Sequence, residues 1–195
     1  MTRKYLLPAV VLVAAALAGC GSSPVTHFYT LNTVAAPAPS NAKVSYTVAI
    51  GAVTLPDGLD RPQIVLRKAG NQVAVAEFER WVGSLKDEIA LAVAANLKQS
   101  LDGASVFAQP MGGGMNADVN VLLYVQRFDS VLGDAAAVEV LWQVSPAKGA
   151  AKSGQSTVRE PAGGAGYDAL VAAHGRALAA VSRDIAAAIR AAVSP

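Results

Sequence analysis

The stretch Val119-Asn120-Val121-Leu122-Leu123-Tyr124-Val125 places an apolar side chain at every second position. This period of two is typical of a β-strand with one face buried against a core. Residues 138–145 repeat the alternation, and Gly133-Asp134 in the connection favours a tight turn. The two stretches therefore predict a β-hairpin, and residues 153–160 predict a third, more polar strand beside it.

Five further stretches before this hairpin also predict strands. Pro56 and Gly58 give a turn signal, and the polar residues 68–71 connect two apolar runs as in a second hairpin. The predicted strands are residues 25–31, 44–54, 59–67, 72–76 and 104–108.

Two longer segments change to a helical period. Apolar residues recur every three or four positions over Glu77 to Leu101 and over Tyr167 to Val193, so each segment predicts a helix with one core-facing stripe. Trp81 lies beside the first stripe, near its start. Strands and helices in this order predict an α+β fold, in which a mainly antiparallel sheet has two long amphipathic helices packed on one face.

The first nineteen residues have the three zones of a secretory signal peptide. Arg3-Lys4 precedes an apolar run, Leu6 to Leu17, that is shorter than the roughly 20 residues of a membrane-spanning helix. The run closes on Leu17-Ala18-Gly19-Cys20, which resembles the bacterial lipobox, where the cysteine is acylated and cleavage falls just before it. We therefore expect residues 1–19 to be removed and Cys20 to carry a lipid anchor. The alternative, an ordinary signal peptide, would leave the lone thiol unpaired in an oxidising compartment.

Charge and composition limit the partners of the mature chain. Residues 1–19 hold two of the sixteen basic side chains, which leaves fourteen basic and fourteen acidic groups. The mature chain shows no basic stripe, so we expect no nucleic-acid partner. Residues 20–195 fit a single lipid-anchored periplasmic domain, with a Pro/Ala-rich linker at about 33–43. Gly21 is not the aspartate that tends to retain enteric lipoproteins at the inner membrane, so we expect the outer membrane.

The residues offer little for catalysis. His27 lies in a predicted strand and His174 on the apolar stripe of the last helix, where a structural role is expected. A metal site usually needs three or four ligands, and no cysteine remains once Cys20 is acylated. Gly112-Gly113-Gly114 lacks the ending of a phosphate-binding loop, and no Gly-x-Ser-x-Gly elbow is present. We expect no enzyme activity, no catalytic residue, no metal and no cofactor.

The most unusual cluster runs from Leu55-Pro56 to Arg67 and is joined by Arg80-Trp81. An Asp-Arg pair before a proline can fix a turn, and an arginine beside a tryptophan can stack on it, so the first interpretation is structural. Partner binding is the second interpretation. The residues singled out for either role are Leu59, Asp60, Arg61, Pro62, Gln63, Arg80 and Trp81.

These residues resemble the PqiC-like (YmbA-like) auxiliary lipoproteins of ABC-type transport systems built around MCE proteins. The resemblance covers nearly the whole mature chain. It is carried by Phe28-Tyr29-Thr30-Leu31, Leu55-Pro56, residues 59–65, Arg80-Trp81 opening the predicted helix, residues 125–129 and residues 167–174.

The resemblance implies a noncatalytic, lipid-anchored part of an intermembrane lipid transporter. The implied partners are the membrane, through acylated Cys20, and an MCE-domain protein whose conduit is docked at the outer membrane; a homo-oligomer also stays open. The family has no catalytic residue to carry over. Two alternatives remain, a structural envelope lipoprotein that links membrane and cell wall, and a periplasmic lipoprotein that binds lipid itself.

Overall fold

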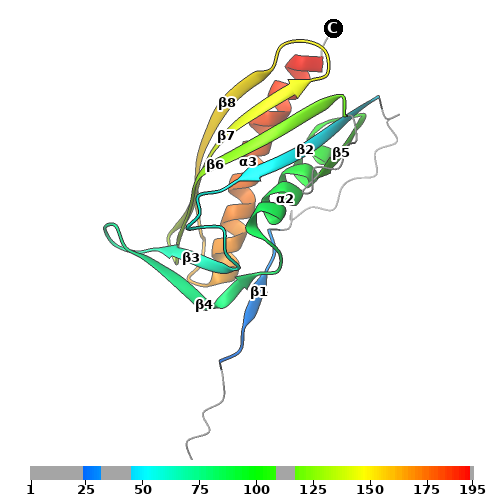
Figure 1. Cartoon of the computed structure of the whole chain (residues 1–195). Coiled ribbons are helices and arrows are strands. Elements are labelled where there is room, and N and C mark those ends of the chain that lie inside the picture. Colours follow the sequence, from blue (N-terminus) through cyan, green and yellow to red (C-terminus); the bar gives the residue numbers. More distant parts are fainter. Residues whose placement is uncertain (1–23, 32–44, 109–116, 194–195) are drawn as a thin grey trace, which may run out of the picture.

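The central strand of the fold is β6 (Val119–Val131), the strand that the alternating stretch predicts (Figure 1). The computed structural model describes residues 24–31, 45–108 and 117–193. Within them, one eight-stranded sheet has the order β1-β4-β3-β6-β2-β5, and β7 and β8 extend it from the other edge of β6. The remaining strands are β1 (His27–Tyr29), β2 (Tyr46–Thr54), β3 (Gln63–Arg67), β4 (Val73–Trp81), β5 (Ala104–Ala108), β7 (Ala135–Pro146) and β8 (Lys152–Pro161).

Several predicted features lie outside the described residues. They are the signal peptide of residues 1–19, Cys20, the linker at 33–43 and the triple glycine at 112–114. Among the described helices, none is long and apolar enough to cross a membrane.

The sheet confirms the α+β prediction and combines both strand directions. The two longest ladders, β6 with β7 and β7 with β8, are antiparallel, as the tight turn predicted for β6 and β7, and β3 and β4 form the second antiparallel hairpin. The pairings β1–β4, β2–β5, β2–β6 and β3–β6 are parallel. Parallel neighbours need long crossover connections, and β3, β4 and α2 (Leu85–Ser100) together form the one between β2 and β5.

Both helices pack on the same face of the sheet. α3 (Tyr167–Val193) contacts β7 and β8, α2 contacts β2 and β5, and the two helices contact each other (Figure 1). Along β6, Val119, Val121 and Leu123 are almost fully buried beneath them, whereas Asn120 and Tyr124 on the other face are exposed. The alternation thus gave the correct inward face.

The predicted start of the first long helix is wrong. Residues 73–81 continue the hairpin as β4, and Phe78 and Val82, which the helical stripe placed in the core, are 43% and 61% exposed. The helix begins only at Leu85, because the hydroxyl oxygen of Ser84 accepts a hydrogen bond from the amide of Asp87 at 3.1 Å and caps it. Arg80-Trp81 therefore ends a strand and does not open a helix.

His174 has the buried position expected of it. Its ring is fully buried, lies stacked on Phe128 with ring centroids 3.9 Å apart, and has Nε2 2.8 Å from the Ser130 hydroxyl oxygen. Nδ1 has no partner among the described residues. A buried nitrogen without a partner costs least when it carries no proton, which leaves Nε2–H to donate to Ser130.

Gly154 on β8 offers a direct test of the packing between sheet and α3. It lies opposite Trp142 of β7, whose indole donates to Ser156, and a Cβ at position 154 would lie 2.3 Å from the indole ring. We expect Gly154→Ala to lower the free energy of unfolding by about 1–3 kcal/mol, because the indole must move and give up its hydrogen bond. Urea denaturation measures this change. Gly58→Ala is the control, since its Cβ would meet nothing within 4 Å; equal stability of the two variants would contradict the packing described.

Candidate functional site

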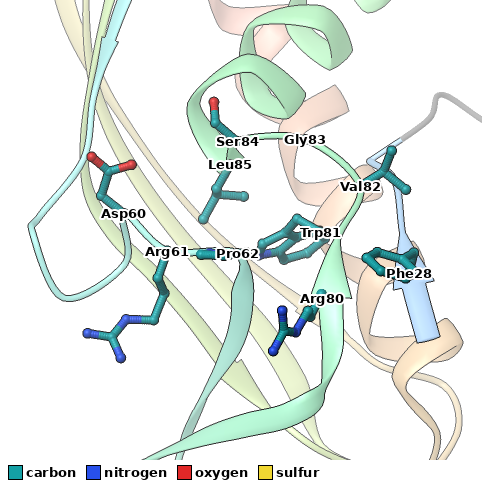
Figure 2. A pocket seen from close by; sticks show the side chains of 10 residues that line it. All are labelled: Phe28, Asp60, Arg61, Pro62, Arg80, Trp81, Val82, Gly83, Ser84 and Leu85. Atoms are coloured by element: carbon teal, nitrogen blue, oxygen red, sulfur yellow. The ribbon is translucent and has the colours of Figure 1, made fainter. Parts of the chain in front are cut away.

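An open groove lies at the β1 end of the sheet (Figure 2). Three segments form it: β1, the turn before β3, and the connection from β4 to α2. Its volume is about 480 Å³. The lining residues are Phe28, Asp60, Arg61, Pro62, Arg80, Trp81, Val82, Gly83, Ser84 and Leu85. Five of the seven residues singled out from the sequence therefore meet here, and Leu59 and Gln63 border the inner side of Trp81.

Backbone hydrogen bonds hold the three segments together. The amide of Trp81 donates to the carbonyl of Pro62 at 2.8 Å, and the amide of Val82 donates to the carbonyl of Tyr29 at 2.9 Å. The turn itself is closed by the Leu59 amide, which donates to the carbonyl of Pro56 at 2.9 Å. The groove is therefore a fixed part of the sheet and does not depend on one loop.

Trp81 supplies the buried base of the groove and Phe28 and Val82 its apolar rim. The Trp81 side chain is 3% exposed and meets Phe128 edge to face, with ring centroids 6.3 Å apart. Phe28 pairs with Arg80 across β1 and β4, and both Phe28 and Val82 are 61% exposed. Trp81 therefore has the structural role that was the first interpretation of this cluster. The exposed side chains of Phe28 and Val82 have no such packing role.

The charged groups of the groove pair differently from the sequence-based interpretation. Asp60 forms an ion pair with Lys86 of α2, with 2.6 Å between Oδ2 and Nζ. Arg80 donates from Nε to the carbonyl of Glu77 at 3.3 Å, and within the described segments it has no cation–π contact with Trp81. Neither Arg61 nor Arg80 forms an ion pair with a described carboxylate. Two guanidinium groups therefore remain available at one groove.

A carboxylate behind the groove holds β1 in place. Glu79 of β4 lies 3.0 Å from His27 Nδ1 and accepts a hydrogen bond from the Tyr29 hydroxyl at 2.5 Å. Partial burial would raise the pKa of Glu79, but the hydrogen bonds from Tyr29 and His27 outweigh it and lower that pKa. Burial, and next the hydrogen bond to Glu79, raise the pKa of the Tyr29 hydroxyl. Leu31 is fixed as well, since its amide donates to Glu88 of α2 at 2.9 Å.

Comparison with known protein families identifies the family of this chain. The sequence pattern of the family described as "ABC-type transport auxiliary lipoprotein component" matches residues 29–186, which include α2, most of α3 and all residues of the groove except Phe28. The chain belongs to this family. The resemblance noted from the sequence is thereby confirmed.

Curated relatives of the auxiliary lipoprotein family agree with this assignment. The chain is 28% identical over 130 residues to the intermembrane transport lipoprotein PqiC of Escherichia coli K12, an alignment that covers 65% of this chain and 68% of PqiC. The PqiC of Shigella flexneri matches with the same identity and coverage.

Solved structures show the same fold. A crystal structure of an uncharacterized protein superposes with a TM-score of 0.70 at 21% identity, covering 85% of this chain and 99% of that protein. A protein of Xanthomonas campestris superposes with a TM-score of 0.63 at 19% identity, covering 84% and 94%. At these identities the likeness concerns the fold alone.

Sequence reasoning missed part of the groove of this auxiliary lipoprotein. Val82 was assigned to a helix, and Ser84 and Leu85 were not singled out. A signal for them exists, because Ser84-Leu85-Lys86-Asp87 has the spacing of a helix N-terminal capping motif. A prediction based on this motif would have started the helix after Ser84, ended the strand before Gly83 and placed Val82 on the surface.

Proposed function

We propose that this chain is the noncatalytic, lipid-anchored auxiliary subunit of an intermembrane lipid-transport system. Acylated Cys20 would hold it at the periplasmic face of the outer membrane, and the folded domain would dock the end of a periplasmic conduit built from MCE-domain protein. The observation that carries the proposal is the family match over residues 29–186, together with the relationship to intermembrane transport lipoproteins.

The fold supports a docking role over a lipid-carrying one. A protein that sequesters acyl chains needs an apolar space between its layers, about the size of the chains. Here α2 and α3 fill the inner face of the sheet with their own side chains, such as Leu97, Leu178 and Ile185, all fully buried. A continuous apolar path across the periplasm is then a task for a partner, since each exposed methylene of a lipid costs about 0.8 kcal/mol.

The tether supports docking through local concentration. A partner that reaches a membrane-fixed subunit meets it at an effective concentration set by the tether, so even a weak contact is occupied. Docking of this kind requires no catalytic activity of the auxiliary subunit, which is consistent with its membership of a family of transport components.

Affinity capture tests this proposal. The native lipoprotein is purified from cross-linked envelopes, and mass spectrometry identifies both its partners and its N-terminal peptide. Recovery of an MCE-domain protein with acylated Cys20 is the expected result. Acylated Cys20 with peptidoglycan alone would support the structural envelope lipoprotein and refute the transport role.

A further inference from the structure

The groove lies at the end of the molecule that the lipid anchor must hold near the bilayer. This inference rests on the anchor at Cys20 of the proposed function. Cys20 is five residues before Val25 in the sequence, so the two Cα atoms are at most about 18 Å apart. Val25 leads directly into β1, and β1 lies at the opposite end of the molecule from the C-terminal end of α3 (Figure 1). The β1 end therefore faces the membrane surface.

Exposed apolar side chains gather at this end. Val25 is 73% exposed, and Phe28 and Val82 are each 61% exposed. An aromatic ring and aliphatic side chains of this exposure are unfavourable toward water and favourable at a bilayer interface, where Phe enters the boundary between headgroups and acyl chains. Because these side chains lie at the end of the domain nearest the lipid anchor, they can enter the bilayer interface.

The charges of the groove complement a phosphate. Arg61 and Arg80 lie on either side of Pro62, and their guanidinium groups extend in the same direction (Figure 2). The Asp60 carboxylate beside them is paired with Lys86, the Glu79 carboxylate is hydrogen-bonded to Tyr29 and His27, and neither carboxylate forms an ion pair with the two arginines. Guanidinium groups bind phosphate oxygens through paired N–H donors, and arginines near an anionic leaflet are attracted to it.

We propose that this groove contacts the phospholipid headgroups of the membrane that carries the anchor. Arg61 and Arg80 pair with lipid phosphate, while Phe28 and Val82 enter the interfacial layer beside them. The contact orients the domain, so that its α3 C-terminal end points away from the bilayer toward the periplasm. An acidic segment of a partner protein would offer similar charge, but the five-residue connection to Cys20 favours the lipid.

Site-specific photo-cross-linking in the cell envelope tests the contact with the full lipidated chain. A benzophenone amino acid replaces Val82 in the groove or, as the matched control, Leu141, which is 37% exposed on β7. After irradiation, mass spectrometry of the labelled peptide distinguishes a phospholipid adduct from a protein adduct. We expect the phospholipid adduct at position 82 to exceed that at position 141 at least five-fold.

A second part of the experiment reverses the charges of the two groove arginines. Arg61→Glu/Arg80→Glu is expected to lower the phospholipid adduct at position 82 at least five-fold, whereas Lys148→Glu/Arg183→Glu, an equal change of charge elsewhere on the surface, leaves it unchanged. Equal phospholipid yields at positions 82 and 141, or only protein adducts at position 82, would overturn the inference. These readouts are separate from partner capture: a lipid adduct without an MCE-domain partner would refute the transport role alone, and a partner adduct at position 82 would refute the lipid contact alone.

Discussion

Removal of the acylation site is expected to move nearly all of the mature chain from the membrane to the soluble periplasmic fraction. The variant combines Cys20→Ala with exchange of residues 1–19 for a signal peptide that is cleaved without lipidation. Each buried methylene contributes about 0.8 kcal/mol, and two or more acyl chains hold a protein stably, so their loss removes the dominant anchor. Cell fractionation and the mass of the N-terminal peptide measure the result.

The folded domain should not respond to this change. The buried core begins at Leu31, and all described core residues follow it, so urea denaturation is expected to agree with the native chain within about 0.5 kcal/mol. Gly21→Ser, which keeps the cysteine, is the control and should stay at the membrane. Membrane association of the unacylated variant at the native level would contradict the anchor. If a small fraction of the unacylated variant stays at the membrane and is released by salt, the arginines of the groove would account for it, because salt weakens attraction to an anionic surface.

The features that the sequence predicts best are those with an uninterrupted period. The helix from Tyr167 to Val193 has its predicted ends, because its stripe runs unbroken from the Pro/Gly-rich connection that precedes it. The β6–β7 hairpin was equally predictable, since both strands alternate and Gly133 takes a positive φ of 76° in the turn between them. Here local pattern and tertiary packing favour the same structure.

The predictions that failed depend on contacts between distant segments. Phe78 and Val82 happen to match a helical phase, but residues 73–81 pair with β3 on one side and β1 on the other, and this pairing overrides the weaker local preference. Strand direction is also absent from an alternating pattern, so the parallel pairing of β2 with β6 could not be deduced from either strand alone.

The candidate site shows the same limit at the level of single residues. The cluster around Asp60 and Arg61 was visible in the sequence, but its partners were not. Lys86, which pairs with Asp60, is 26 residues away, and Phe28 reaches the groove only through the pairing of β1 with β4. The sequence therefore identified the unusual residues, and the fold decides which of them pack and which face outward.

Acidification below pH 6.5 is expected to destabilise the fold through His174. Complete burial lowers the pKa of this imidazole to about 3, whereas in the unfolded chain it is about 6.5. Above pH 6.5 both states are neutral, and this contribution to stability is fully present. Below pH 6.5 only the unfolded chain binds the proton, so the free energy of unfolding falls by about 1.4 kcal/mol per pH unit until about pH 3.

Between pH 6.5 and 4.5, the effect of His174 on the free energy of unfolding can be measured separately from the effect of the carboxylates. Hydrogen bonds from the side chain and backbone of Thr47 lower the pKa of Asp118, and those from Tyr29 and His27 lower the pKa of Glu79 against its partial burial. Stability that depends on these groups is lost only as the pH falls below about 4.5, near the ordinary pKa of a carboxyl group. Urea denaturation at pH 7.0 and pH 5.0 should thus differ by about 2 kcal/mol in the native chain because of His174.

A double variant separates the imidazole from the rest of the core. His174→Leu/Ser130→Ala removes both partners of the buried hydrogen bond, so no polar group is left without a partner, and most of the difference between pH 7.0 and pH 5.0 should disappear. His27→Gln removes the exposed histidine and should keep that difference. If the double variant loses as much stability on acidification as the native chain, then His174 binds its proton in the folded state. Its stacked position against Phe128 would then have to open at mildly acidic pH.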